Sequence, residues 1–190
     1  MAKKALIAVL KALKAATPLK VRVLLRPLEE AAQKMVFGRQ QMMVLGSSRP
    51  LPGLVLKKGV AIKTFQEFPD KQAWVGLVNG VLGEWDLRTA EAFFFGEKNF
   101  APCLCVFIFC EGKPAGTACG RIIEKKGKRT GEVHMVAVLP EFRGMGLGYA
   151  VTLDVLHRLR KNSAGDIVLR TDLWRAPAVK VYEKLGFKAI

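Results

Sequence analysis

The stretch Glu141–Ala150, EFRGMGLGYA, decides how this chain folds and what it binds. It places three glycines and an arginine within six positions, between an apolar run that ends at Pro140 and a helical pattern that begins near Gly146. A loop with so few side chains exposes its backbone amides, and the first turn of the following helix adds more amides at the positive end of the helix dipole. The stretch therefore predicts a loop that grips a phosphate group.

Two common phosphate-binding fingerprints do not match this loop. Its glycine spacing differs from that of the Rossmann fingerprint, and Asp166 opens a strand, whereas the ribose-binding acid of that fingerprint belongs at a strand's end. A Walker A loop requires Gly-Lys-Ser/Thr, which does not follow here. The spacing R-x-x-G-x-G at Arg143, Gly146 and Gly148 instead resembles the acetyl-CoA pyrophosphate loop of the GNAT N-acetyltransferase superfamily.

A second motif near the C-terminus supports the same resemblance. The stretch 176–187, APAVKVYEKLGF, is similar to the late helix of that superfamily, in which a Tyr is followed four residues later by Gly-Phe, as Tyr182 is here. The resemblance covers Leu54–Ile190, and the stretches 73–79 and 134–160 look closest to mycothiol-synthase-like enzymes. It implies an α/β fold in which a central mixed β-sheet is flanked by helices.

The hydrophobic pattern also predicts a sheet that is antiparallel first and parallel later, because strands alternate with helices only in the second half of the chain. Residues 104–110 and 115–123 are typical of a hairpin, and Val133–Val138 is typical of a central strand covered on both faces. The other expected elements are a first strand in 57–65, a helix capped by Asp70, a second short helix in 80–96, a helix over 146–162, a strand in 166–173 and a helix over 176–185.

Charge divides the chain unevenly. Of the formal net charge of +15, residues 1–59 hold 12 Lys and Arg against 2 Glu, so the remainder is only mildly basic. Turn residues at Gly46–Gly53 separate the two parts. We expect residues 1–53 to form a basic, helical N-terminal extension and residues 54–190 to form the GNAT acetyltransferase domain. Residues 1–50 either pack on the domain as a solvated helix or contact an acidic macromolecule or a membrane surface.

Composition favours a globular protein of the cytoplasm without a transmembrane segment. The longest apolar run, Phe100–Cys110, is about half as long as a membrane-spanning helix and predicts a buried strand. The four cysteines lack the paired spacing and the neighbouring histidines of a zinc site, so we expect reduced core cysteines and no bound metal. The oligomeric state stays open between monomer and homodimer. The cysteines are Cys103, Cys105, Cys110 and Cys119.

The resemblance assigns acetyl-CoA to the glycine loop and to the strand before it. In the superfamily the pantetheine arm lies along this strand, and a backbone amide there, expected at Val136, polarises the thioester carbonyl. One position departs from the family pattern, because Arg175 stands where the late helix usually opens with an Asn. The residues expected to bind the coenzyme are Val136, Ala137, Val138, Arg143, Gly144, Met145, Gly146, Leu147, Gly148, Tyr149 and Arg175.

Acetyl transfer to an amine also needs groups that move protons. The resemblance makes Tyr182 the acid that protonates the departing sulfur, although its place on an apolar helix face also fits core packing. Glu132 and His134 occupy the places of two histidines that help deprotonate the amine in arylalkylamine N-acetyltransferases. Either is the expected base, directly or through water, unless His134 is a core histidine and Glu132 begins its strand in solvent.

Glu84, Trp85 and Asp86 fall in the loop region from which the superfamily builds its acceptor pocket. An acidic pair there would attract a cationic amine, but the same residues equally fit a surface turn that caps a helix. The chain ends at Ile190, which leaves little room for the final strand pair that usually walls the acceptor site. We expect a more open pocket, or one closed by the N-terminal segment or a second chain.

These features together predict an N-acetyltransferase that moves an acetyl group from acetyl-CoA to a primary amine, most simply that of a small molecule, by direct attack in a ternary complex. Two alternatives stay open. One is a catalytically inactive acyl-CoA-binding module, and the other is an acetyltransferase of a protein-bound or ribosome-bound lysine that the basic N-terminal segment recruits.

Overall fold

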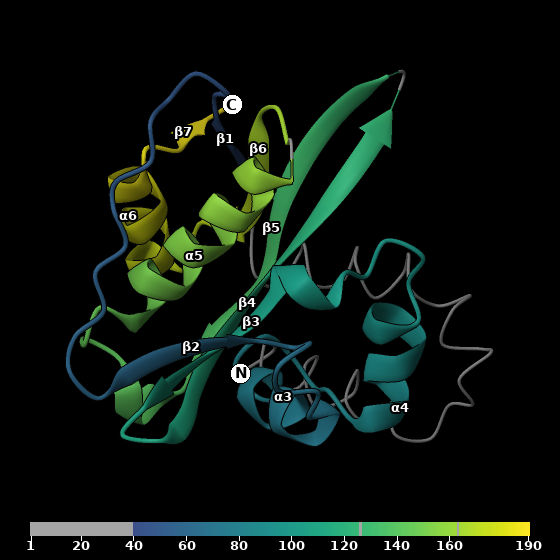
Figure 1. The fold of residues 1–190 in the computed structure, drawn as a ribbon, viewed down its shortest axis with the longest axis vertical. Helices are drawn as coiled ribbons and strands as arrows, with labels where there is room; N and C mark the ends of the chain where they lie inside the picture. The colour runs from purple at the N-terminus through teal and green to yellow at the C-terminus, as the bar shows by residue number, and fades with distance from the viewer. Residues whose placement is uncertain (1–39, 126, 163) are drawn as a thin grey trace, which may run out of the picture.

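Seven strands form one sheet in the described part of the protein, which comprises residues 40–125, 127–162 and 164–190 of a computed structural model. The strands are β1 (Gln40–Leu45), β2 (Val60–Thr64), β3 (Cys105–Cys110), β4 (Lys113–Lys125), β5 (Lys128–Val138), β6 (Ile167–Asp172) and β7 (Lys188–Ala189). Their order across the sheet is β2-β3-β4-β5-β6-β1-β7 (Figure 1). Only β5 and β6 pair in parallel, and the five other neighbouring pairs are antiparallel. The expected mixed sheet is confirmed.

The helices begin and end close to the positions that local sequence signals predict. The Asp70 carboxylate accepts from the Ala73 amide at 2.8 Å and so caps the first helix. Gly186 ends the last helix with φ of 97°, a left-handed conformation that favours glycine. The helices are α3 (Lys71–Val78), α4 (Leu87–Ala90), α5 (Leu147–Lys161) and α6 (Ala176–Leu185), with a π-helical turn at Glu91–Phe95 and short 3-10 turns at Pro102–Leu104 and Pro140–Phe142.

The sheet has a hydrophobic core on each face, because β3 is buried along its whole length and alternates its side chains between the two sides. Val106 and Ile108 pack into an aliphatic core with side chains of α5 and α6. Phe107 and Phe109 pack into an aromatic core with side chains of α3 and of the π-helical turn. Figure 1 shows the same arrangement, with α5 and α6 on one side of the sheet and α3 and α4 on the other.

The first described strand corrects the expected boundary after Gly53. β1 lies between β6 and β7, with Gln40 opposite Asp172 and Leu45 opposite Ile167, so residues 40–45 belong to the sheet. Met43 and Leu45 are buried in the aliphatic core, which explains why this short apolar stretch joins the domain. Residues before the expected boundary therefore supply a strand between β6 and β7. The rest of the expected extension, residues 1–39, lies outside the described residues.

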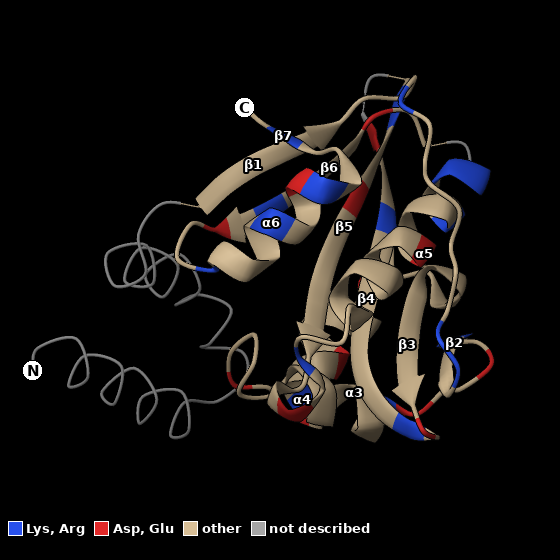
Figure 2. Ribbon diagram, turned by 90° about the vertical axis from the view of Figure 1, so that its left-hand side faces the viewer, with Lys and Arg blue, Asp and Glu red and all other residues tan. Residues whose placement is uncertain are grey.

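A linker (residues 46–59) crosses from β1 at one side of the sheet to β2 at the other, and Figures 1 and 2 show it passing α5. Three contacts tie it to that helix. Arg160 Nη2 donates to the carbonyl oxygen of Gly46 at 2.6 Å, and His157 Nε2 donates to that of Pro52 at 2.9 Å. Lys57 Nζ donates to the carbonyl oxygen of Met145 at 3.4 Å, just before α5 begins. The linker is therefore fixed along the helix rather than looped into solvent.

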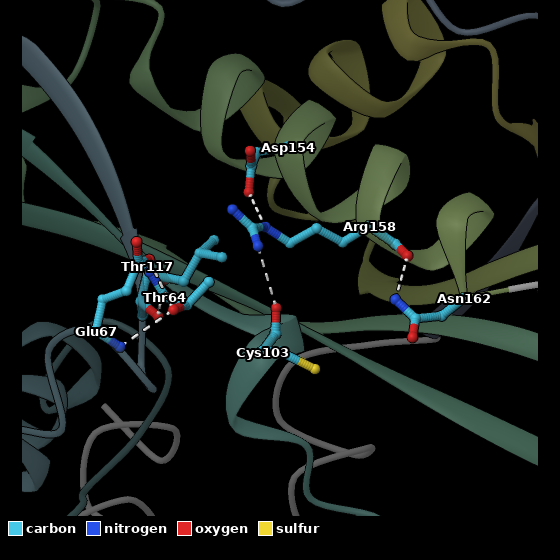
Figure 3. Close-up of polar contacts among 8 residues, drawn as sticks. Thr64, Glu67, Cys103, Thr117, Asp154, Arg158 and Asn162 are labelled. Carbon is cyan, nitrogen blue, oxygen red and sulfur yellow. Dashed lines mark hydrogen bonds and ion pairs between the residues drawn. The ribbon is translucent and has the colours of Figure 1, made fainter.

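Polar contacts also join α5 to the rest of the fold (Figure 3). Arg158 forms an ion pair with Asp154 at 2.5 Å and donates to the carbonyl oxygen of Cys103 at 3.4 Å. The Cys103 side chain is exposed, so the expectation of four core cysteines is wrong at this position and holds for Cys105, Cys110 and Cys119. Cys103 is exposed because it lies in the 3-10 turn before β3 rather than in the strand.

None of the helices in the described ranges has the length and hydropathy needed to cross a bilayer.

Candidate active site

The two parallel strands separate in the middle of the sheet. β5 pairs with β6 only from Gly131 to Val133, although both strands continue beyond that point. At the separation Met135 has φ of 54°, and Met135 and Val136 together lie opposite Ala118 of β4, which is a β-bulge. The segment expected to bind the coenzyme, Val136 to Val138, thus lies where β5 has no register partner in β6. An opening between two sheet strands gives access to backbone groups that a continuous sheet would cover.

The glycine loop follows directly and opens into α5. Gly144 and Gly146 have φ of 79° and 84°, and a side chain built on either would meet no atom within 4 Å, so both face open space. No side chain caps α5, and its first internal bond runs from the Ala150 amide to the Gly146 carbonyl. The amides of Leu147, Gly148 and Tyr149 are therefore left without helical partners. These glycines and amides fit a phosphate group, as the sequence predicts.

Arg143 fixes the loop to the end of the strand. Its Nε donates to the carbonyl oxygen of Val138 at 3.2 Å, and its side chain is exposed. The arginine of the motif thus holds the turn between β5 and α5 in shape, with the remaining guanidinium nitrogens available to a ligand.

A cavity of about 300 Å³ lies at this helix start. Its walls come from the loop, from the linker and from α6, which contributes Lys184. Lys57 of the linker also lines it, and Lys184 Nζ lies 5.2 Å from the centre of the Tyr149 ring. The residues along it are Val55, Leu56, Lys57, Val60, Gly144, Met145, Gly146, Leu147, Tyr149, Ala150 and Lys184.

Tyr182 lies on α6 with its ring in the aliphatic core, 6.2 Å from the ring of Phe187. The side chain is 7% exposed. Burial raises the pKa of Tyr182 to about 12, although the positive charge of Arg175 acts in the opposite direction. The core-packing interpretation is therefore correct for the ring, and a hydroxyl with this pKa keeps its proton at neutral pH.

Glu132 and His134 both face the aromatic side of the sheet, since alternate residues of a strand share a face. Glu132 is buried and pairs with Arg121 of β4, whose Nε lies 2.6 Å from Oε2. Arg121 also pairs with Glu97 at 3.0 Å. Glu132 therefore does not begin its strand in solvent, and one of its oxygens is already occupied by a guanidinium.

The His134 ring lies 5.6 Å from the ring of Phe94 and opposite Cys119 in the sheet register. Burial, with a smaller effect of the Arg121 charge, lowers the pKa of His134 to about 3. The imidazole is consequently neutral at physiological pH and is a weak base.

The loop between α3 and α4 brings the three expected acceptor residues together but uses two of them structurally. Asp86 caps α4, because its Oδ1 accepts from the Thr89 amide at 2.7 Å. The Trp85 amide donates to Asn79 Oδ1 at 3.1 Å, and its ring packs edge-on against Trp74 at 5.5 Å. Glu84 is exposed on the same turn. The helix-capping interpretation is thus correct for Asp86, and Trp85 anchors the loop to the aromatic core.

Arg175 joins the start of α6 to the loop between α3 and α4. Its Nε pairs with Asp172 at 3.1 Å, its Nη1 donates to the Val81 carbonyl at 3.3 Å, and its guanidinium lies 4.6 Å from the centre of the Trp174 ring. The structure therefore joins Arg175 to the loop between α3 and α4, through a carboxylate and a carbonyl that hold its guanidinium in this position. The expected contact of Arg175 with the coenzyme stays a prediction.

Comparison with known proteins identifies the family. The sequence profile described as "Acetyltransferase (GNAT) family" matches residues 64–187. This chain belongs to the GNAT acetyltransferase family. A mycothiol acetyltransferase of Acidothermus cellulolyticus is 30% identical over 156 residues, covering 73% of this chain and 48% of that protein. One from Thermomonospora curvata is 34% identical over 148 residues, covering 73% of this chain and 47% of that protein. The chain thus spans about half the length of the curated relatives it matches.

Solved structures give the same fold. A GCN5-related N-acetyltransferase from Sphaerobacter thermophilus superposes with a TM-score of 0.66 at 22% identity, covering 80% of this GNAT chain and 48% of the other. A chain of the NatC complex, solved with Gag peptide and CoA, superposes with a TM-score of 0.58 at 17% identity, covering 69% and 86%. The resemblance stated from the two sequence motifs is confirmed, and so is the mixed sheet flanked by helices that it implied.

Sequence reasoning missed four residues that shape the site of this GNAT domain. Lys57 lies in a turn-rich stretch and carries no motif, so no local signal marks it. Lys184 follows Tyr182 by two residues and stands beside Glu183 in the last turn of the helix, where a lysine is common, so it carried no distinguishing signal. Arg121 and Asn79 act through contacts that only the register of β4 with β5 and the fold of the acceptor loop bring about.

Proposed function

We propose that this GNAT chain transfers an acetyl group from acetyl-CoA to a primary amine of a small molecule by direct attack in a ternary complex. One observation carries the proposal: an uncapped helix with a left-handed glycine loop begins beside the opening between β5 and β6. Unpartnered amides at a helix N-terminus bind phosphate, and open strand edges bind an extended chain with amide groups. Coenzyme A contains both a diphosphate and such a chain.

Acetyl-CoA, when bound, supplies a thioester whose carbonyl carbon accepts the amine. In this chain the loop amides from Gly144 to Tyr149 hold the diphosphate, and the backbone of Val136 to Val138 orients the pantetheine arm. The bulge at Met135 supports this arrangement, because it breaks the regular register of β5 at the point where polarisation of the carbonyl is needed.

Tyr182 provides the proton for the departing sulfur. With a pKa near 12 its hydroxyl is protonated across the neutral range, so the acid form needs no separate protonation step before each turnover. The C–S bond breaks, the sulfur takes the Tyr182 proton, and solvent returns a proton to the phenolate afterwards.

The proton that the amine loses passes to the pair formed by Glu132 and His134, directly or through water. Both side chains face the same side of β5. Among the described residues, neither is hydrogen-bonded to another side chain that could accept the proton in its place. Because His134 is a weak base, its role is to relay the proton in the transition state rather than to store it. Glu84, on the loop near this face, attracts the cationic amine.

The small-molecule acceptor rests on the relatives, which are named mycothiol acetyltransferases. A second candidate function has an observation in its favour, because Glu132 is held by Arg121 and His134 is a weak base. A domain with these two features that binds CoA but lacks a base strong enough for turnover would be an acyl-CoA-binding module.

Gly146→Asp tests the loop, because it places a carboxylate among the amides that hold the phosphates. CoA affinity by calorimetry should fall by at least about 100-fold, the loss of roughly 3 kcal/mol. Gly112→Asp is the matched control, since Gly112 also has a positive φ of 75° and open space around it but lies in the turn between β3 and β4. Unchanged CoA binding by the Gly146 variant would remove the assignment.

Tyr182→Phe tests turnover against mere binding. We expect kcat for an amine panel, followed by release of free CoA thiol, to fall by about 10²-fold or more, as loss of a general acid does, while the Kd for CoA stays within about twofold. CoA binding by the wild-type chain without thiol release for any amine would favour the acyl-CoA-binding module instead.

A further inference from the structure

Arg121 contacts two carboxylates that come from different parts of the fold. Its Nε lies 2.6 Å from Oε2 of Glu132, and its Nη1 lies 3.0 Å from Oε2 of Glu97. The side chain of Arg121 is 26% exposed, against 11% for Glu132 and 31% for Glu97. One half-buried guanidinium therefore joins the strand that carries Glu132 to the turn that carries Glu97.

The pair of Arg121 and Glu132 lies where the sheet has become narrow. The two residues stand opposite each other in the register of β4 and β5. β3 pairs with β4 only as far as Cys119, and Figure 1 shows β4 and β5 continuing together past that point. A single cross-strand ion pair at such a position contributes little to stability. Loss of Arg121 should therefore leave the fold intact.

Glu97 is itself held firmly, so it can anchor Arg121. Its amide donates to the Phe94 carbonyl at 3.2 Å, and its carbonyl accepts from the Phe100 amide at 2.9 Å. The rings of Phe94 and Phe100 pack 5.1 Å apart, and Phe94 is buried in the aromatic core. The Phe94 ring also lies 5.6 Å from the His134 ring. The anchor of Arg121 thus belongs to the turn that covers the other proposed base.

This turn has an irregular backbone. It follows the π-helical segment Glu91–Phe95, which continues directly from α4. Segments of π-helix are rare and occur frequently at functional sites. The irregular segment, the aromatic packing and the two ion pairs of Arg121 therefore meet on the face of the sheet to which Glu132 and His134 point.

We infer that Arg121 is a positioning residue for the transfer, which orients the Glu132 carboxylate and is itself fixed by Glu97. The inference rests on the proposed function, in which Glu132 takes part in removing the proton of the amine. Because the guanidinium holds Oε2, Oε1 can receive that proton, directly or through water. The amine nitrogen bonds to the acetyl carbon, its N–H bond breaks, and the proton goes to Glu132. Arg121 keeps its own protons throughout.

A double-mutant cycle of Arg121→Gln and Glu132→Gln tests this role, with kcat for an amine panel followed by release of free CoA thiol. Glutamine removes each charge but keeps hydrogen-bonding groups. Each single variant should lower kcat by about 10- to 100-fold, as misplacement or loss of a base does. If Arg121 acts through Glu132, the double variant should lie within about threefold of Glu132→Gln. Effects that multiply, or an unchanged kcat in either single variant, would overturn the inference.

Arg158→Gln is the matched control on the other face of the sheet. Arg158 pairs with Asp154, their side chains are 31% and 14% exposed, and Arg158 has a second partner in the Cys103 carbonyl. Arg121→Gln and Arg158→Gln should shift the urea midpoint by similar small amounts and keep the Kd for CoA within about twofold. Only Arg121→Gln should lower kcat. An equal loss of kcat in both would mean that Arg121 acts through stability alone.

Arg121→Lys gives a second measurement that does not depend on the glutamine variant. It keeps the positive charge but lacks the planar fork that reaches two carboxylates, so its kcat should lie between those of the wild type and Arg121→Gln. A kcat no higher than that of Arg121→Gln would count against a role of the charge beside Glu132. If the wild-type chain releases no thiol with any amine, the proposed function fails and the inference fails with it. An active wild type whose Arg121 variants keep their kcat overturns the inference alone.

Discussion

The proposed coenzyme side and the proposed acceptor side of this domain are constructed in different ways. On the coenzyme side, one continuous stretch from Val136 to Tyr149 supplies the strand opening, the glycine loop and the helix start. On the acceptor side, the contacts join parts that are farther apart in sequence, such as Arg175 with Val81 and Arg121 with Glu97. A contiguous anion site needs only local conformation, whereas a pocket assembled by ion pairs depends on the whole fold. The difference explains why one side follows a motif and the other does not.

The coenzyme side does not depend on local sequence alone, because its helix α5 packs on a core to which β1 contributes. Leu45 is fully buried in the core beneath α5 and α6. Leu45→Ala should lower the free energy of unfolding by about 2–5 kcal/mol, through lost burial and the cavity left behind. Urea unfolding measures it, with Gln41→Ala on the same strand as the control. A loss of unfolding free energy no larger than that of the Gln41→Ala control would show that burial of Leu45 in β1 contributes little to stability.

The acceptor side should be the acid-sensitive one. His134 has a folded pKa of about 3 against 6.5 in an unfolded chain, so below pH 6.5 the unfolded state takes up the proton and the folded state resists it. Stability should therefore fall as pH falls, by about 1.4 kcal/mol per pH unit between 6.5 and 3.

His134→Phe isolates this contribution by placing a ring that cannot titrate beside Phe94. Between pH 6.5 and 5 the variant should lose about 2 kcal/mol less stability than the wild type. Urea unfolding at the two pH values measures the difference. Equal losses in both proteins would mean that the imidazole is accessible to protons in the fold.

The Arg175→Ala substitution should have the smallest effect on stability. It tests whether the acceptor side can be altered without a change in coenzyme binding. Arg175→Ala removes one ion pair and one bond to the acceptor loop, worth about 1 kcal/mol together. We expect KM for the amine to rise about fivefold with an unchanged Kd for CoA. Arg170→Ala, at an exposed position of β6, is the control. Weaker binding of CoA by the Arg175→Ala variant would support a contact between Arg175 and the coenzyme.

The sequence was informative wherever the signal was local. The hairpin of β3 and β4, the Asp70 cap, and the helices α5 and α6 with Gly146 and Gly186 at their ends all follow from short patterns, and the structure confirms them. The family and its mixed sheet followed from two motifs. Residue roles at the site remain predictions, except where the structure shows a different contact.

What the sequence could not predict depends on long-range pairing. β1 is a short apolar stretch within a basic segment, and only its partners β6 and β7 make it a strand. Arg175 was assigned to the coenzyme by its place in a motif, and that motif gave no sign of its contacts with Asp172 and the Val81 carbonyl. The low pKa of His134 likewise arises from aromatic residues that pack on β5 from another part of the chain.

The position of β1 has a consequence for biosynthesis. β1 leaves the ribosome before any other described strand, yet it pairs with β6 and β7, which are made after all the other described strands. Its two edges must stay unpaired through most of translation, and an unpaired apolar edge invites strands of other chains. Completion of this sheet therefore waits until β7 has been made, and the growing chain is exposed to misassembly through the unpaired edges of β1 until then.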